Sequence, residues 1–176
     1  KNTFSVSLWF KTTTTTRSRI FTDYAQTSRN CDIIMNANGT VEVTTDYNQS
    51  SNTIFISSSA YNDGNWHHIV VALNQSAGER TVYIDGLLLD TSTLSTNSWS
   101  GSSGSRVTLG AFYSSSSGYS QHLDGSIDQV RIFNKALIAD DVETLYAETS
   151  STASNTNPLG EGAGKLLFSF DYDASD

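Results

Sequence analysis

Aromatic side chains recur in this chain at positions where their rings could face solvent and bind a sugar. A sugar site needs such rings beside amides or carboxylates. Trp9 lies opposite the apolar residues of an alternating segment and is expected on the outer surface of a sheet, while the tyrosines fall in or near expected loops. Each ring taken alone could instead cover an edge of the core, so the binding hypothesis depends on the group. The candidate ligand-binding residues are Trp9, Tyr24, Tyr47, Tyr61, Trp99, Tyr113 and Tyr119.

Carboxylates and histidines are also present, but their spacing predicts no catalytic centre. Glu42 and Asp46 share one face of an expected strand, which a solvated strand surface explains. His67 and His68 are adjacent in an expected strand, so they point to opposite faces and cannot serve one site. His68 shares a face with Val70 and is expected to be a hydrogen-bonded core histidine. We therefore predict no catalytic residue.

The hydrophobic pattern predicts an almost all-β chain. Residues 4–11 alternate apolar with mostly polar side chains, which is typical of a half-buried strand. Further strands are expected at 33–35, 41–43, 53–58, 66–73, 81–85, 87–89, 106–112 and 127–133. A two-residue hairpin turn is expected at Asn38-Gly39 and a turn at Asp85-Gly86. The predicted core includes Trp66, Val70, Val82, Ile84, Leu109, Val130 and Ile132.

The remaining segments complete this picture. One helix is expected at 139–147, with acidic residues in its first turn but no polar capping side chain at Ile138. The stretches 95–105 and 114–120 are rich in Ser and Gly and are expected to be flexible loops.

Composition limits the classes of partner. The 176 residues carry a net charge of −8 with ten Lys and Arg, so a nucleic-acid backbone would be repelled. No apolar run approaches the roughly 20 residues of a membrane helix. Cys31 is the single cysteine, so no disulfide within the chain is expected. We predict neither a nucleic-acid nor a membrane partner.

Four motifs in fixed order support a resemblance to a known family. They are FSVSLWFK at 4–11, DGNWHHIVV at 63–71, VYIDG at 82–86 and LDGSIDQVRIFNKAL at 123–137. Together they resemble the laminin G-like, concanavalin A-like jelly roll, a pentraxin-related family. The resemblance implies a two-sheet antiparallel jelly-roll β-sandwich with one short C-terminal helix. Glycosidases of this class that resemble laminarinases carry Glu-x-Asp-x-x-Glu on one strand, a spacing absent here.

The resemblance also implies a calcium site. Asp128 stands where the closing strand of the family offers a carboxylate, and Asp171, Asp173 and Asp176 match the acidic stretch after its first strand. Calcium prefers several carboxylate and carbonyl oxygens. The expected cofactor is therefore Ca²⁺, although acidic residues here could also serve solubility and turn formation.

The tail suggests a strand that the family normally has before the segment at 4–11. We expect a laminin G-like sandwich at 1–148, a flexible linker at 149–164 and a strand within 165–176. That strand could fold back or be donated to a neighbouring chain, or it could start a second repeat. Its Asp-Tyr-Asp-Ala-Ser-Asp continuation resembles repeats of marine bacteriophage virion proteins.

The function expected from these observations is a non-catalytic, lectin-like adhesion module that binds a glycan or cell-surface polysaccharide. Its parent would be a larger extracellular or virion-surface protein. The alternative is a structural module that self-associates or contacts other virion proteins in a fibre or capsid. A glycoside hydrolase is disfavoured by the missing carboxylate motif.

Overall fold

A computed structural model describes residues 3–25, 28–47, 53–94, 106–114, 116–148, 159 and 166–170. The chain divides into two compact units. The first contains residues 1–10, 67–93 and 128–176, and the second contains residues 11–66 and 94–127. No helix among the described residues is long and apolar enough to cross a membrane.

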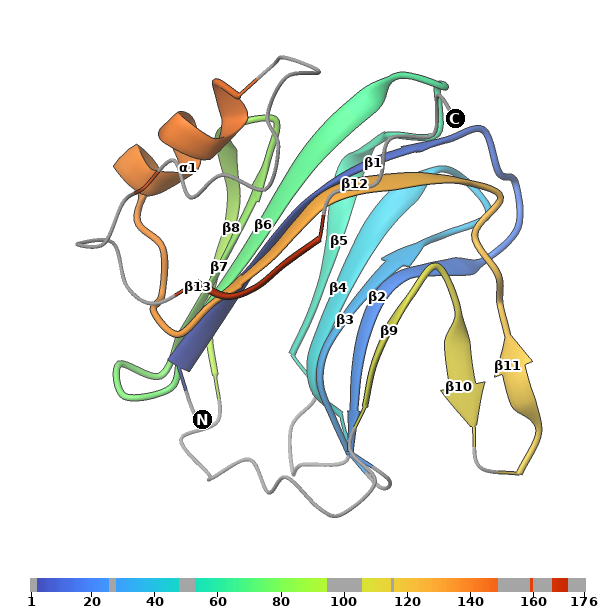
Figure 1. Ribbon diagram of the computed structural model, residues 1–176, viewed down its shortest axis with the longest axis horizontal. Coiled ribbons are helices and arrows are strands. Elements are labelled where there is room, and N and C mark those ends of the chain that lie inside the picture. Colours follow the sequence, from blue (N-terminus) through green and yellow to red (C-terminus); the bar gives the residue numbers. More distant parts are fainter. Residues whose placement is uncertain are drawn as a thin grey trace. The chain divides into compact units, whose positions relative to one another are not determined.

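Nearly all the described secondary structure is β-strand (Figure 1). The elements are β1 (Thr3–Thr12), β2 (Ser18–Ala25), β3 (Ser28–Met35), β4 (Thr40–Tyr47), β5 (Thr53–Ala60), β6 (Trp66–Asn74), β7 (Glu79–Ile84), β8 (Leu87–Thr93), β9 (Arg106–Leu109), β10 (Phe112–Ser114), β11 (Gly118–Ser120), β12 (Gly125–Phe133), α1 (Ala139–Tyr146) and β13 (Leu166–Phe170).

The larger sheet has the strand order β13-β12-β1-β6-β7-β8. Strands β7 and β8 form a hairpin in which Ile84 pairs with Leu87 across a two-residue turn. Both turn residues have positive φ, +52° at Asp85 and +79° at Gly86. This backbone matches the right-handed twist of the strands and favours a glycine at the second position. The predicted Asp85-Gly86 turn is confirmed.

Helix α1 packs on this sheet through a narrow apolar stripe. Val142 and Leu145 are fully buried and cluster with Val70, Tyr83 and Phe133. No side chain caps the helix at Ile138, but the Asp141 carboxylate accepts a hydrogen bond from the Ile138 N–H at 3.1 Å. The helix therefore begins where the sequence predicted, with Asp141 satisfying a donor at its N-terminus.

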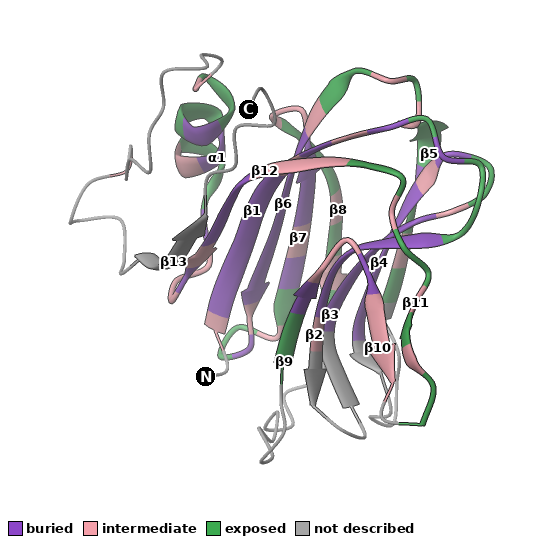
Figure 2. Cartoon of the chain, turned by 45° about the vertical axis from the view of Figure 1, so that its right-hand side comes forward, coloured by how far each residue is buried: buried purple, intermediate pink, exposed green. Residues whose placement is uncertain are grey.

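Strand β1 is buried on both faces, as Figure 2 shows by its purple colour. The prediction of a half-buried strand was wrong, because polar side chains on the second face are also covered. Ser5 donates to the Lys135 carbonyl at 2.7 Å, and the Ser7 hydroxyl lies 2.9 Å from Nε2 of His68. Hydrogen bonds thus let small polar residues occupy buried strand positions.

The predicted core is largely, but not wholly, confirmed. Val70, Val82, Ile84 and Val130 are buried, whereas Leu109 and Ile132 are partly exposed. Trp66 is 40% exposed, so its assignment to the core was wrong. It is the first residue of β6, and the Lys11 ammonium lies over its ring, 5.2 Å from the centroid.

The second unit is built on a five-stranded sheet with the order β5-β4-β3-β2-β9. A four-residue connection, residues 36–39, joins β3 to β4. The Gly39 N–H donates to the Asn36 carbonyl at 2.9 Å, and Gly39 has φ +83°. The predicted two-residue Asn38-Gly39 turn was therefore too short, although its glycine occupies the left-handed position that such a hairpin needs.

A small hairpin of β10 and β11 occupies part of the stretch expected to be a loop. Phe112 pairs with Ser120, and Tyr113 pairs with Tyr119. The loop prediction for 114–120 was wrong because it rested on Ser and Gly content, whereas cross-strand pairing of the two tyrosines holds this hairpin. The other predicted loop, 95–105, lies outside the described residues.

Strand β13 pairs antiparallel with β12 at the edge of the larger sheet. Val130 lies opposite Phe170 and Ile132 opposite Phe168, with a register shift before Phe133. This arrangement corresponds to a tail that folds back. The division into a sandwich, a linker and a completing strand stays a prediction.

Deleting residues 149–176 should destabilise the chain, because the outer backbone edge of β12 would lose its partner. We expect a loss of at least about 1 kcal/mol, equivalent to a fall in Tm of about 2–4 °C. Thermal melting followed by circular dichroism measures the change. A chain ending at residue 170, which retains β13, is the control, and equal melting of the two would contradict a stabilising role for the strand.

Candidate functional site

One face of the five-stranded sheet carries most of its polar side chains. Glu42 pairs across strands with Ile34 and Ile56, and Asp32 pairs with Thr22 and Thr44. Paired residues share a face, so these side chains lie together. The opposite face carries buried apolar residues such as Ile33 and Val43. The first of these surfaces is called the polar face below.

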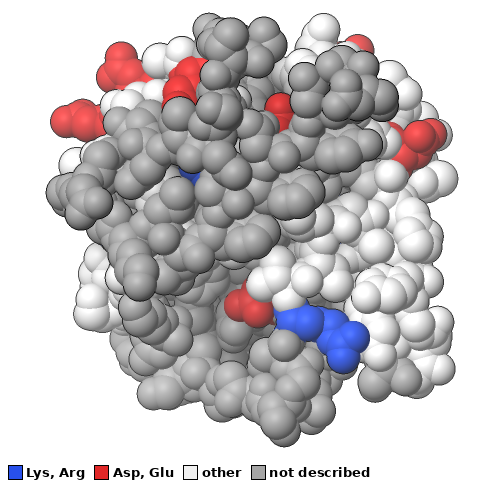
Figure 3. Space-filling model, in the orientation of Figure 1, with Lys and Arg blue, Asp and Glu red and all other residues white. Residues whose placement is uncertain are grey.

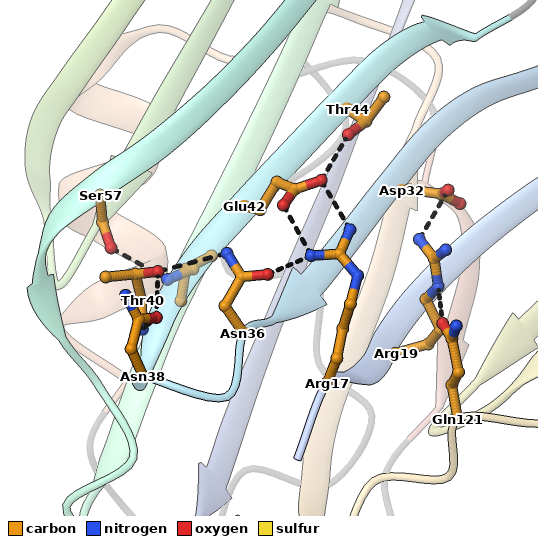
Figure 4. Close-up of polar contacts among 11 residues, drawn as sticks. Arg17, Arg19, Asp32, Asn36, Asn38, Thr40, Glu42, Thr44, Ser57 and Gln121 are labelled. Carbon is orange, nitrogen blue, oxygen red and sulfur yellow. Dashed lines mark hydrogen bonds and ion pairs between the residues drawn. The ribbon is translucent and has the colours of Figure 1, made fainter. Parts of the chain in front are cut away.

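An arginine fixes the central carboxylate of the polar face. The Arg17 guanidinium donates to both oxygens of Glu42 at 2.8 Å, and Thr44 donates to Oε1 at 3.1 Å (Figure 4). Arg17 also hydrogen-bonds to the amide oxygen of Asn36. The hydrogen bonds from Arg17 lower the pKa of Glu42, and the same pairing raises the pKa of Arg17. Glu42 is therefore an anchored anion and cannot supply a proton at neutral pH.

A second arginine ties the sheet to the loop after β11. Arg19 and Asp32 form an ion pair at 2.8 Å, with 6% and 0% of their side chains exposed. Arg19 also donates from Nε to Oε1 of Gln121 at 2.9 Å and from its backbone N–H to the Gln121 carbonyl at 3.0 Å. Gln121 has φ +51°, a conformation that costs energy outside glycine and is kept here by these bonds. Arg19 thus holds the loop next to β11 against the sheet.

An exposed aromatic cluster lies on the hairpin that this loop follows. The rings of Tyr113 and Tyr119 meet edge to face, with centroids 5.1 Å apart and planes at 63°. The Arg106 guanidinium covers the Tyr113 ring at 3.9 Å from its centroid. Tyr119 is 59% exposed, and Arg106 is also exposed. We call Arg106, Tyr113 and Tyr119 the hairpin cluster.

Arg106 belongs to the polar face. It is two residues from Thr108 on β9, and Thr108 pairs with Thr22, which in turn pairs with Asp32. Alternate residues of a strand share a face, so Arg106 continues the row of polar side chains to the edge of the sheet. Among the described residues on the face that Figure 3 draws, few side chains are basic. Arg17 is also exposed but is paired with Glu42, so an exposed cation without a carboxylate partner among the described residues is a distinctive feature of this acidic chain.

Among the described side chains, no other predicted sugar-binding residue belongs to this cluster. Tyr61 is half-buried in the connection after β5, where its N–H donates to the Gly39 carbonyl at 2.8 Å. Tyr24 and Tyr47 lie in β2 and β4, but their side chains are outside the described part of the structure, as is all of Trp99. These four residues stay predictions.

Trp9 lies on the predicted side of β1 but beneath the helix. Its ring stacks on Tyr146 of α1 at 5.7 Å and contacts His68 at 5.1 Å. Nε1 of Trp9 is buried and has no hydrogen-bond partner among the described residues. Trp9 is therefore a partly covered packing residue rather than an open platform, because α1 supplies a ring that the strand pattern could not reveal.

His68 is a core histidine, as predicted. It is 1% exposed, and its Nε2 contacts the Ser7 hydroxyl. Its backbone N–H donates to the Asp85 carboxylate at 2.9 Å. Burial and, to a smaller extent, the nearby Arg131 charge lower the pKa of His68 to about 3, against the opposing effect of the Asp85 charge. The imidazole is neutral at physiological pH. His67 faces away and pairs with the other Asp85 oxygen at 2.8 Å.

The predicted calcium ligands are not gathered by the described residues. Asp128 is half-buried, and its Oδ1 accepts a hydrogen bond from the Gln129 N–H at 2.7 Å. Gln129 has φ +47°, so the backbone at this position is strained. Asp171, Asp173 and Asp176 lie outside the described residues, and no group of three acidic, His or Cys residues is found among those described. The calcium site stays a prediction.

Arg106 and Gln121 were not identified as site residues from the sequence. Arg106 acquires its role from the ring of Tyr113 in the neighbouring hairpin, and Gln121 acquires its role from Arg19 in β2, which is distant in the chain. The strand predicted at 106–112 placed Arg106 at its first position but did not reveal the contact with the Tyr113 ring. A hairpin prediction for 112–120 would have paired the tyrosines and drawn attention to the neighbouring arginine.

Comparison with known families identifies the fold. A laminin G family model, described as the concanavalin A-like lectin/glucanases superfamily, matches residues 1–143. This range is most of the chain, so the protein belongs to that superfamily. The all-β jelly-roll class, with antiparallel sheets and one short helix, is confirmed. No curated protein sequence matches the chain significantly.

Several solved structures share this fold at low identity. A heptameric SAP-like pentraxin of Limulus polyphemus has a TM-score of 0.67 and 17% identity, covering 97% of this chain and 81% of the pentraxin. The CBM40 of a Ruminococcus gnavus IT-sialidase has a TM-score of 0.68 and 15% identity. The match covers 85% of this chain and 83% of the CBM40. A Bacteroides ovatus protein assigned to carbohydrate binding has a TM-score of 0.67 and 15% identity, covering 99% of this chain and 46% of that one.

The neutral state of buried His68 should make stability depend on pH. The folded pKa lies below the value of about 6.5 for an exposed histidine, so the unfolded chain takes up the proton first. Stability is fully present above about pH 6.5 and falls as the pH drops toward about 3, by up to ~1.4 kcal/mol per unit. Urea unfolding between neutral pH and mildly acidic pH, before carboxylates titrate, measures this slope.

The variant His68→Gln keeps a polar group near Ser7 but removes the titration. The unfolding free energy of this variant should change less with pH than that of the parent chain over the same interval, even if the variant is less stable throughout. Identical slopes would show that His68 does not remain neutral in the folded chain.

Proposed function

We propose that the chain is a non-catalytic, lectin-like module that binds carbohydrate through the hairpin cluster. The observation that carries this proposal is the exposed Tyr119 ring, which meets the half-buried Tyr113 ring edge to face, together with Arg106 over Tyr113. Exposed rings offer apolar surface to the flat face of a sugar, and neighbouring polar groups can bind its hydroxyls. The cluster is held in place by the Arg19–Gln121 bonds, so little ordering would be needed on binding.

Structures of the same fold support this class of function. The Ruminococcus gnavus CBM40 was solved with α2,3-sialyllactose bound, and the Bacteroides ovatus protein is assigned to carbohydrate binding. Both are distant in sequence, so the support concerns what such a sandwich can do. Which glycan this chain binds must be inferred from its own residues.

A binding role also fits the ionised state of Glu42, the central carboxylate of the polar face. A glycosidase needs one carboxylic acid that can donate its proton near neutral pH. Glu42 is held ionised by Arg17, and the Thr44 hydroxyl also donates a hydrogen bond to its Oε1. We propose that this carboxylate organises the polar face instead of taking part in catalysis.

The setting and the cofactor remain part of the proposal. The motif resemblance supports a module of a larger extracellular or virion-surface protein, including the phage origin suggested by its tail. The resemblance likewise supports calcium at Asp128, with Asp171, Asp173 and Asp176 as further ligands. A chelator arm in the binding experiment tests the metal separately from the aromatic cluster.

Glycan binding should depend on the exposed ring of the hairpin. We expect the full chain to bind members of a glycan array and Tyr119→Ala to lose roughly tenfold in affinity, the worth of one well-stacked ring. Leu87→Ala is the matched control, because Leu87 is 66% exposed and lies in the other unit. The array is read with and without a calcium chelator.

Equal binding by Tyr119→Ala and Leu87→Ala would remove the hairpin cluster from the site. Absence of binding to every glycan would overturn the proposed function. Turnover of laminarin, agar, alginate or peptidoglycan, lost on Glu42→Gln, would replace it with an enzymatic one.

A second candidate function, an assembly module, is favoured by one observation. Strand β8 is an edge of the larger sheet and exposes three consecutive leucines, Leu87, Leu88 and Leu89, at 66%, 55% and 39%. Exposed apolar edge strands readily pair with other chains. In this candidate, β8 joins another copy of the chain or a neighbouring fibre protein.

The assembly candidate predicts self-association that depends on β8. Light scattering from micromolar to submillimolar concentrations should show oligomers of the parent chain and monomers of Leu88→Lys, because a charge on an edge strand prevents pairing. Leu88→Ala keeps the edge uncharged and serves as the control. A parent chain that is monomeric at all concentrations would exclude this candidate.

A further inference from the structure

Basic side chains are few in this chain, and most of those described are neutralised. Ion pairs with carboxylates at 2.6–2.9 Å hold five of them: Arg17–Glu42, Arg19–Asp32, Arg80–Asp90, Arg131–Glu148 and Lys135–Asp141. Two described basic side chains, Lys11 and Arg106, lie over aromatic rings instead. An unneutralised cation in a chain of net charge −8 is a candidate for binding an anion.

The geometry of Arg106 leaves its hydrogen-bonding edge open. Its guanidinium lies 3.9 Å from the centre of the Tyr113 ring, which occupies one face of the planar group. The N–H donors of a guanidinium lie in its plane and point outward from its rim. No described residue forms a hydrogen bond or an ion pair with them. Stacking therefore orients the fork while leaving it free to bind a carboxylate at two points.

The exposed Tyr119 ring contacts the same Tyr113 ring that the Arg106 guanidinium lies over. Its centroid is 5.1 Å from that of Tyr113, and the side chain is 59% exposed. A ligand that fits both groups has a flat, partly apolar ring and a carboxylate at its rim. A sugar acid, such as a hexuronic acid or a sialic acid, has both features.

We propose that the hairpin cluster is a subsite for a carboxylated sugar, with Arg106 binding the carboxylate and Tyr119 packing on the sugar ring. This proposal rests on the carbohydrate-binding function proposed above and specifies the class of sugar. The net charge of −8 repels densely charged polyanions, so the carboxylated residue belongs to a glycan that is otherwise mostly neutral.

Lys11 provides the comparison that isolates this chemistry. It too lies over an exposed ring, that of Trp66, at 5.2 Å. Its ammonium is a compact point charge without a planar fork, and it offers no bidentate match to a carboxylate. Removing Lys11 changes the net charge by the same amount as removing Arg106, so nonspecific charge effects are common to both variants.

The experiment measures binding of the full chain to matched pairs of glycans. Each hexuronate and sialoside on an array is presented as the free acid and as its methyl ester, which keeps the ring and removes the charge. The variants are Arg106→Ala, Arg106→Lys and Lys11→Ala, each checked for an unchanged Tm. Affinities for the free acids that bind are then measured by calorimetry at two salt concentrations.

We expect the free acids to bind about tenfold or more tightly than their esters, as a charge-assisted bidentate contact predicts. Arg106→Ala should abolish that preference, so that free acids and esters bind with equal affinity, and Arg106→Lys should restore only part of it. Lys11→Ala should retain the full preference.

Other outcomes overturn the proposal in distinguishable ways. If acid and ester bind equally, or if Arg106→Ala and Lys11→Ala weaken binding alike, Arg106 is not a carboxylate subsite, while carbohydrate binding through Tyr119 stands. Binding to neutral glycans alone would likewise exclude the carboxylate subsite and leave carbohydrate binding in place. If no glycan of either kind binds, both the subsite and the proposed function fall.

Discussion

Ion pairing of buried guanidinium groups is the constraint on which much of this structure depends. Arg19, Arg80 and Arg131 are almost completely buried, and each is paired with a carboxylate. Burying an unpaired charge is costly, so removing either partner of such a pair is strongly destabilising. These pairs allow polar side chains to cover sheet faces that would otherwise need apolar residues. They also leave few cations for other purposes, which makes an unpaired arginine informative.

The same constraint builds the candidate site. Arg19 is held by Asp32 on one side and binds both oxygens of Gln121 on the other, so a buried ion pair fixes the loop that continues from β11. Arg106, at the edge of the same polar face, has no carboxylate partner among the described residues and stacks on Tyr113. Structure and binding therefore use arginines of one sheet differently. The paired arginine positions the loop next to the hairpin, and the unpaired one is available to bind the proposed ligand.

Much of the fold could be predicted because local signals determine it. The hydrophobic pattern located β6 and β7, the Asp85-Gly86 turn defined the hairpin of β7 with β8, and His68 was recognised as a core residue from the face that it shares. Strand β2 and the β10–β11 hairpin were not predicted. Two register shifts interrupt the alternation of β2, and the Ser- and Gly-rich stretch 114–120 forms strand only through its cross-strand partners. Trp9 and Trp66 exchanged their expected environments, since helix α1 covers the former and Lys11 meets the latter at the exposed start of a strand. In the site, the exposed tyrosines were predicted, but the role of Arg106 depends on a ring contact that spacing does not encode.

The central claim is that the hairpin cluster is where a ligand binds. Its most direct test is an NMR titration of the isotope-labelled full chain with the tightest free-acid glycan, following backbone amides and the Nε–H of Arg106. The account predicts shifts concentrated in β9, β10 and β11, together with a large shift of the Arg106 Nε–H. Shifts confined to α1 and β12, with Arg106, Tyr113 and Tyr119 unaffected, would contradict it.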